Sequence, residues 1–156
     1  MNGIPNKILL IGYGNPGRLD DGLGPAIADA VEKMDLPDVT VDSNYQLTVE
    51  DAANLATHDV VIFADASVKG KEPFFFKKIE PKPGMNFSTH SIEPEGVLGY
   101  AHQLFGAKTV GYTLGIRGYR FNEFGEEISE KALKNMKQAL KFLEDAIKAK
   151  DFVEIE

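Results

Sequence analysis

The sequence predicts an α/β fold, in which helices cover both faces of a mostly parallel or mixed, twisted sheet. Along its 156 residues, short apolar runs alternate with longer amphipathic stretches, which is typical of strands joined by crossover helices. No repeat, low-complexity segment or linker divides the chain, so we expect a single domain over residues 1–156. A chain of this length buries about 70% of its extended surface, which is enough for a stable core.

The N-terminal half contains three predicted strands and two predicted helices. The apolar run 7–12 indicates a strand buried on both faces, and it is followed by a glycine-rich loop. Apolar residues at helical spacing predict a helix over 22–34, and a second strand follows at 39–42. A variant capping box, with Asp in the usual Glu position, predicts a short helix within 48–56. The run 58–65 is a third strand, apolar until it ends in a carboxylate.

The C-terminal half completes the predicted sheet. Prolines flank the run 74–79, which favours an edge or near-edge strand. A helix is expected over 94–105 and a further strand over 109–117. The stretch 129–148 is expected to be a long final helix, because its Ser-Glu start and lysine-rich end complement the helix dipole.

Charge and composition exclude several classes of function. The chain has 17 basic and 24 acidic residues, giving a net charge of −7, which disfavours nucleic acid as a partner. It contains no cysteine, so a thiol nucleophile, a thiolate metal site and a disulfide are all excluded. No apolar run is long enough for a signal peptide or a membrane span. We therefore expect a soluble, cytoplasmic protein without a membrane partner, and a monomer, since no heptad pattern demands assembly.

The glycine-rich loop formally matches a dinucleotide-binding motif. The pattern G-x-G-x-x-G spans 12–17, and Asp42 lies 25 residues beyond it, near the distance of a ribose-binding acid. However, Pro16 removes an amide donor, and the acids Asp20 and Asp21 would repel a pyrophosphate. One of the two acids could instead cap the following helix. The second acid is then a candidate ligand or base at the carboxyl end of a strand.

Three polar residues fall where three different strands should end. Asp21 follows the first strand, Asp65 ends the third, and His90 lies in the loop after the fourth. Two carboxylates and an imidazole suit a nickel or zinc ion and leave coordination positions open. The alternative for His90 is a surface or hydrogen-bonded residue. His58 and His102 are expected to be structural or exposed.

Four segments together resemble the maturation proteases of nickel–iron hydrogenases. They are the loop Ile11–Gly24 with its two acids, Val61–Ala66, Ser88–Pro94, and Leu114–Gly118 followed by Phe124–Ser129. The resemblance spans residues 7–145, and the double-Asp loop is its most specific part. It implies a three-layer αβα sandwich of phosphorylase/hydrolase-like architecture.

The resemblance also implies an activity and its residues. Members of that family recognise nickel through the second acid of the loop, the Asp of the middle strand and the later His, which correspond here to Asp21, Asp65 and His90. These three are expected to be both metal ligands and catalytic residues of an aspartic-type, metal-recognising endopeptidase. Its partner would be a [NiFe] hydrogenase large-subunit precursor, whose C-terminal extension it removes. The precursor would bring the nickel, and the isolated protein is expected to bind nickel or a surrogate divalent ion only weakly.

One segment departs from the family pattern, and two alternatives stay open. Many members carry Asp-Gly-Gly-Thr after the second strand, where this chain has Asp42-Ser-Asn-Tyr-Gln46, so the substrate subtype is open. A nickel-dependent hydrogenase assembly chaperone that docks without cutting would use the same ligands. The stretch Leu10–Gly17 also resembles peptidyl-tRNA hydrolases, but no His follows before His58, and the acidic charge disfavours tRNA.

Overall fold

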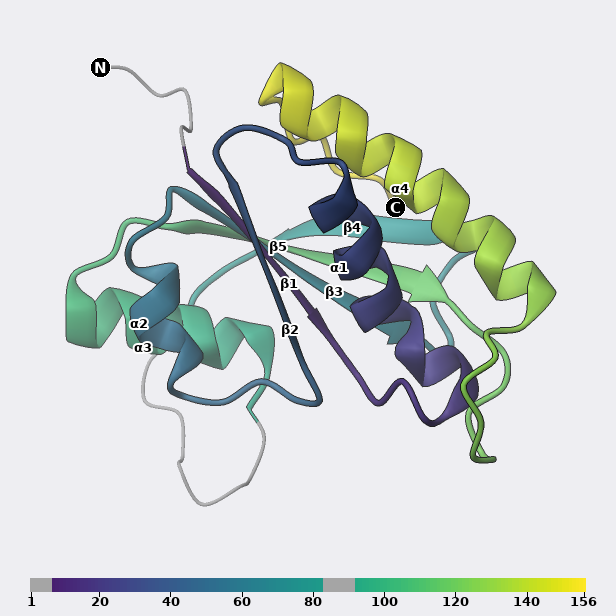
Figure 1. Ribbon diagram of the computed structural model, residues 1–156. Helices are drawn as coiled ribbons and strands as arrows, with labels where there is room; N and C mark the ends of the chain where they lie inside the picture. Colours follow the sequence, from purple (N-terminus) through teal and green to yellow (C-terminus); the bar gives the residue numbers. More distant parts are fainter. Residues whose placement is uncertain (1–6, 83–91) are drawn as a thin grey trace.

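A computed structural model describes residues 7–82 and 92–156, and its centre is a five-stranded sheet (Figure 1). The strands are β1 (Ile8–Tyr13), β2 (Val39–Asn44), β3 (Val60–Ser67), β4 (Phe74–Ile79) and β5 (Val110–Arg117). Their order across the sheet is β2-β1-β3-β5-β4. All neighbours are parallel except β4, which runs antiparallel to β5 at one edge. The expected mixed sheet with an edge strand over 74–79 is confirmed.

Helices cover both faces of this sheet, so the fold is the expected three-layer sandwich. On one face lie α1 (Leu23–Lys33) and α4 (Glu130–Ala149), and on the other lie α2 (Asp51–Leu55) and α3 (Pro94–Phe105) (Figure 1). A 3-10 helix, η1 (Leu19–Gly22), precedes α1. Ser129 caps α4 by accepting a hydrogen bond from the Ala132 amide, as its place before the helix predicts. No helix in the described part of the chain is long and apolar enough to cross a membrane.

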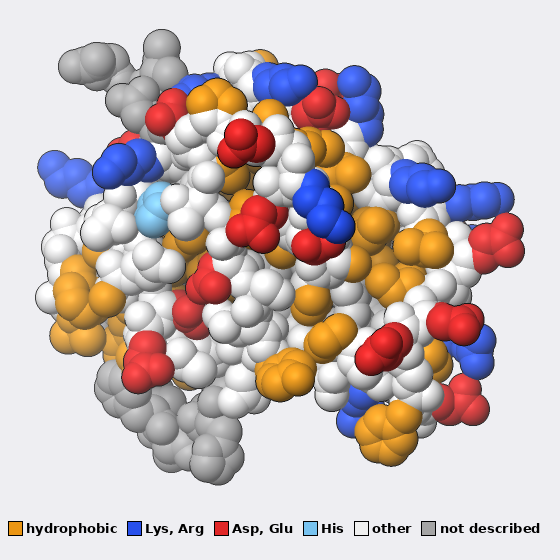
Figure 2. Space-filling view, viewed as in Figure 1, with side chains coloured by type: hydrophobic (Ala, Val, Ile, Leu, Met, Phe, Trp, Pro, Cys, Tyr) orange, Lys and Arg blue, Asp and Glu red, His pale blue; other side chains and the backbone are white. Residues whose placement is uncertain are grey.

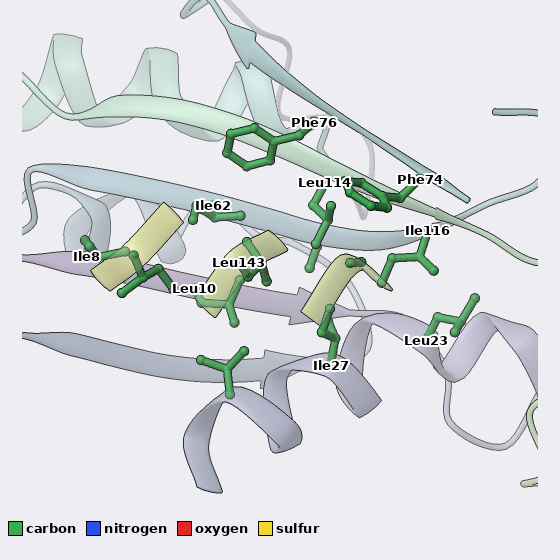
Figure 3. Close-up of a cluster of buried hydrophobic side chains, with 14 of the residues drawn as sticks. Ile8, Leu10, Leu23, Ile27, Ile62, Phe74, Phe76, Leu114, Ile116 and Leu143 are labelled. Carbon is green, nitrogen blue, oxygen red and sulfur yellow. The ribbon is translucent and has the colours of Figure 1, made fainter. Parts of the chain in front are cut away.

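Two apolar clusters join the layers, one on each face of the sheet. Alternate residues of β1 supply both: Ile8 and Leu10 pack toward α1 and α4, whereas Leu9 and Ile11 pack toward α2 and α3. All four side chains are fully buried, each contributing roughly 1.5–3 kcal/mol to the stability of the fold. Figure 3 shows the first cluster, with Leu143 of α4 and Ile27 of α1 directed at the sheet.

Glycines in the loop after β1 allow α1 to approach the sheet closely. A Cβ atom at Gly12 would lie 2.2 Å from the carbonyl oxygen of Gly24, and one at Gly24 would lie 2.3 Å from that of Tyr13. Both distances are shorter than real Cβ contacts allow, so these two positions accept only glycine without a backbone shift. The glycines therefore serve the packing of the strand against the helix.

The two edges of the sheet are treated differently. At β4, the C-terminal segment pairs with the edge: the amides of Phe76 and Ile155 each donate to the other's carbonyl at 2.8 Å. Phe152 packs its ring near Phe76 and Tyr112 and closes the apolar cluster there. At β2, the described residues contain no strand or bridge beyond the β1 pairing.

Most element boundaries agree with the sequence expectations to within a few residues. The largest differences are at strand ends: β2 continues to Asn44 and β3 to Ser67, so Asp65 lies within its strand rather than at the end. Half of the variant capping box forms, because the Asp51 carboxylate accepts the Thr48 amide at 2.9 Å. The helix itself begins at Asp51 without a side-chain cap.

Candidate functional site

The candidate site lies at the carboxyl end of β1 and β3, where open α/β sheets bind their ligands. Asp21 comes from η1 after β1, and Asp65 comes from β3. Their strands are direct neighbours, with Gly12 of β1 paired to Ala64 of β3. The two carboxylates are near enough for the charge of Asp21 to raise the pKa of Asp65.

Asp20 has a structural role that the sequence did not reveal. Its buried carboxylate accepts four hydrogen bonds: from the amides of Tyr119 (2.7 Å), Arg120 (3.0 Å) and Ser129 (2.7 Å), and from the Ser129 hydroxyl (2.7 Å). Burial alone would raise the pKa of Asp20, but these bonds outweigh it and lower the pKa. Asp20 therefore stays ionised and ties the loop after β1 to the connection between β5 and α4.

Backbone contacts hold the same loop in place. Leu19 has a left-handed φ of 54°, which costs a residue with a Cβ conformational energy. Its amide donates to the Gly125 carbonyl at 2.8 Å, and the Asp20 amide donates to the Arg120 carbonyl at 2.9 Å. These bonds fix the backbone on which Asp21 is carried.

Asp21 is half-buried, and the contacts within the loop use only one of its two carboxylate oxygens. Its Oδ2 accepts the Asn15 amide at 2.8 Å, and the Asn15 side chain in turn accepts the Gly17 amide at 2.8 Å. Neither η1 nor α1 has a side-chain cap, so the interpretation that Asp20 or Asp21 caps the following helix is wrong. One acid is an anchor for a distant segment, and the other is free to meet a ligand.

Asp65 is a half-buried carboxyl with an altered acidity. Burial, followed by the negative charges of Asp21 and Glu93, raises its pKa to about 7. Two hydrogen bonds oppose that shift, from the Ala66 amide at 2.8 Å and from the Tyr13 hydroxyl. Tyr13 is itself half-buried, and burial and the Asp65 charge raise its pKa far above the ordinary value, so it remains a hydrogen-bond donor.

A pocket of about 340 Å³ opens beside Asp65. Its apolar walls include Phe63, Phe75 and Leu114, and its carboxylates are Asp65, Glu93 and Glu95. Glu93 and Glu95 flank Pro94 at the start of α3, so this helix end carries acids into the pocket. The pocket thus combines apolar side chains with carboxylates in its lining and suits a cation or a cationic group.

The third predicted ligand, His90, lies outside the described residues. Within residues 7–82 and 92–156, no three acidic or histidine side chains stand close enough to hold a metal ion together. The other histidines are structural: His58 Nδ1 is 2.9 Å from the Asn54 carbonyl oxygen, and His102 Nε2 is 2.8 Å from that of Thr109. Their expected structural role is confirmed.

The glycine-rich loop has the geometry of close backbone packing and not that of a dinucleotide site. A dinucleotide site needs the helix to begin inside the motif, whereas α1 begins at Leu23, after η1. Gly14 has φ 140°, and a Cβ there would lie 2.2 Å from the Asp21 carbonyl oxygen. The loop therefore folds back over η1 and brings Asp21, rather than a row of amides, to the strand end.

Sequence reasoning missed Tyr13 as a member of this site. Tyr13 is the last residue of β1, and the Gly12–Ala64 pairing brings it beside Asp65 on the neighbouring strand. The contact between Tyr13 and Asp65 could be predicted only from the order of strands in the sheet. The pattern of apolar residues along β1 does not reveal which strand lies next to it. Glu93, which stands at the start of α3, was likewise not predicted to line the Asp65 pocket.

Comparison with known proteins supplies a fold likeness. The chain resembles a [NiFe] hydrogenase maturation protease, HycI, from Thermococcus kodakarensis KOD1, with a TM-score of 0.72 and 23% identity over 94% of this chain and 95% of that one. The hydrogenase maturating endopeptidase HybD from E. coli gives a TM-score of 0.67 and 22% identity, covering 96% of both chains. The endopeptidase HycI from Escherichia coli gives a TM-score of 0.68 and 18% identity, covering 96% of this chain and 97% of that one. No family model and no curated protein matches the sequence.

These likenesses extend over nearly the whole of each chain, and they confirm the predicted fold. The structural neighbours carry the names of the proteases that the motifs resemble. At identities below a quarter of the residues, they establish a shared architecture, while activity depends on the site that each chain builds on it.

Proposed function

We propose that the protein is an endopeptidase that removes the C-terminal extension of a nickel-loaded [NiFe] hydrogenase large-subunit precursor. The observation that carries the proposal is the placement of Asp21 and Asp65 together at the carboxyl edge of the sheet. The fold likeness to solved hydrogenase maturation proteases supports the same activity.

The donor set fits a divalent ion that arrives with the substrate. Asp21 keeps Oδ1 after its contact with the Asn15 amide. Asp65 accepts the Ala66 amide and the Tyr13 hydroxyl, and its two oxygens together still have lone pairs that a metal ion could use. Nickel accepts oxygen and imidazole ligands, and an ion between the two carboxylates would relieve their mutual repulsion. The imidazole is assigned to His90, whose side chain the resemblance indicates as the third ligand.

Nickel in the precursor would therefore act as a recognition signal. An extended peptide next to the ion would place its scissile amide by the two carboxylates, where an aspartate or a metal-polarised water attacks the carbonyl carbon. The elements of water are added across the amide, so the products are a new C-terminal carboxylate and a free amine. Burial of Asp20 and its four hydrogen bonds keep the loop fixed through this step.

The test is a processing assay on a hydrogenase large-subunit precursor, prepared with and without nickel and followed by intact mass. We expect release of a C-terminal peptide only from the nickel-loaded precursor, and its loss in Asp21→Asn, Asp65→Asn and His90→Gln. The matched control is Asp29→Asn, which removes an exposed carboxylate of α1 that pairs with Lys33 at 2.9 Å. Retained processing by Asp65→Asn would contradict the proposed mechanism.

The same assay separates the protease from a docking chaperone. Nickel-dependent co-elution of the protein with an uncut precursor would assign it to the non-cleaving class. Absence of both cleavage and binding would reject the hydrogenase precursor as its partner.

A further inference from the structure

The open edge of the sheet at β2 is the feature from which a partner surface can be inferred. Edge strands present unpaired backbone groups that other chains can bind, so proteins usually cover or interrupt them. This protein covers its β4 edge: Ile155 pairs with Phe76, and the Glu154 carboxylate accepts the Lys78 amide at 3.0 Å. In the described residues, no comparable segment lies along β2.

The backbone groups that point away from the sheet can be assigned from two hydrogen bonds. The carbonyls of Asp38 and Asn44 accept the amides of Ile8 and Gly14, at 2.9 and 3.0 Å, so even-numbered residues of β2 face β1. Because successive residues alternate, Val39, Val41 and Ser43 direct their amides and carbonyls outward. Of these groups, the Ser43 amide is taken by the Asp42 carboxylate at 2.9 Å.

Two hollows flank the end of this edge. One of about 740 Å³ contains the carboxylates of Asp42, Glu50 and Asp51 and no lysine or arginine. A smaller hollow of about 280 Å³ lies against Pro16 and Pro25. Both are lined by Asn44 and by Tyr45, whose side chain is 74% exposed. Figure 2 views the molecule from the β2 side and shows acidic side chains spread over the centre of this face.

The edge leads directly to the candidate site. Asn44 lies at the end of the edge, and its carbonyl accepts the Gly14 amide. Asn15, which follows Gly14, lines the larger hollow, and its amide donates to the Asp21 carboxylate. A strand placed along β2 would therefore run past the loop that carries Asp21.

We propose that the outer edge of β2 binds an extended segment of the precursor polypeptide, which joins the sheet as a further strand. Main-chain hydrogen bonds to Val39, Val41 and the Ser43 carbonyl would supply affinity, as in other cases of strand addition. Basic side chains on that segment would lie over Asp42, Glu50 and Asp51. This inference rests on the proposed function, because it takes the substrate of that site as its occupant.

A second copy of this chain is the less favourable occupant. Two copies paired edge to edge through β2 would bring two acidic hollows to one interface, and neither hollow offers the other an opposite charge. The net charge of −7 on each copy adds to the repulsion. A basic, extended segment of another polypeptide meets neither penalty.

The sharpest test replaces Val41 by Pro and compares it with Val41→Ala. Both variants replace the same partly buried, branched side chain, but only Pro removes the outward amide, and it leaves the bonds to β1 intact. For Val41→Pro relative to Val41→Ala, we expect KM for the nickel-loaded precursor to rise at least ~10-fold, with kcat within about twofold. Thermal unfolding of both variants shows whether each is folded.

Hydrogen exchange supplies a measurement that does not depend on cleavage or on a variant. Addition of the nickel-loaded precursor to the full chain should slow exchange of the Val39 and Val41 amides.

A charge variant tests the acidic hollow. Glu50→Gln should weaken precursor binding and reduce its dependence on salt, whereas Glu80→Gln, an exposed position next to the end of β4, serves as the matched control.

Failure of this inference differs from failure of the proposed function. The protein could cleave the precursor while the Pro and Ala variants have equal KM and the Val39 and Val41 amides gain no protection. That result would overturn strand addition at β2 and leave the proposed function standing. Protection of these amides by the protein alone at rising concentration, together with dimer formation, would assign the edge to a second copy and also overturn it. Absence of nickel-dependent cleavage and binding would overturn the proposed function.

Discussion

Replacing Asp65 by Asn should stabilise the fold while abolishing the proposed activity. The pKa of Asp65 is raised from 3.8 to about 7, so the folded protein binds a proton more tightly than the unfolded chain. Such a carboxyl costs stability as the pH rises between these two values, and the full cost remains above the higher one. Asn keeps the shape and carries no charge.

The magnitude follows from the pKa values. Raising a carboxyl pKa from 3.8 to about 7 corresponds to ~4 kcal/mol against the charged form, and solvent reaching a half-buried group reduces this to about 2 kcal/mol. The Asn side chain can still accept from the Ala66 amide and meet the Tyr13 hydroxyl, so little hydrogen bonding is lost. We therefore expect Asp65→Asn to raise the free energy of unfolding by about 1–2 kcal/mol at pH 8.

The assay is urea unfolding of wild type and Asp65→Asn at pH 8 and pH 5, without added metal. The gain should be large at pH 8 and shrink at pH 5, because wild-type Asp65 is then protonated in the folded state. Asp29→Asn, at an exposed position, should show no such pH-dependent gain. A stability gain equal at both pH values, or a loss at pH 8, would refute the assigned environment of Asp65.

Three further changes test the surrounding structure. Asp20→Asn should lower the free energy of unfolding by about 2–4 kcal/mol in urea, because an amide group cannot accept all four hydrogen bonds. Gly24→Ala should lower the melting temperature more than Gly106→Ala, since its Cβ would lie 2.3 Å from the Tyr13 carbonyl oxygen, whereas Ala at Gly106 meets no atom within 4 Å and bears only the strain of a φ of 63°. Tyr13→Phe should raise the pKa of Asp65 further, measured by carboxyl-carbon NMR titration, because its hydroxyl stabilises the charged form.

The fold was largely predictable because each element carries a local signal. The apolar run of β1, the prolines around β4 and the Ser129 start of α4 depend on residues next to one another in the chain. The pairing of the 152–156 segment with β4 had no such signal, because a single bridged residue, Ile155, is too short for a pattern.

The candidate site was predictable only in part. The resemblance selected Asp21 over Asp20, and the structure shows the physical difference between the two acids. That difference could not be derived from the local sequence, because the partners of Asp20 lie 99 to 109 residues away. Tyr13 was missed for a related reason, since its contact with Asp65 depends on β1 and β3 being neighbours. The roles of Asp21, Asp65 and His90 as ligands stay predictions.

The Asp20 anchor also determines when the site can form during synthesis. Its hydrogen-bond partners, Tyr119, Arg120 and Ser129, leave the ribosome about a hundred residues after Asp20 itself. Contacts between residues so far apart in the sequence form late in folding, because other contacts must first offset the entropy lost when the long loop between them closes. A nascent chain that has completed only β1, β2 and β3 would hold Asp21 on a loop that lacks the Asp20 contacts to the connection between β5 and α4. The loop that carries Asp21 would thus reach its final position only once the last quarter of the chain has docked.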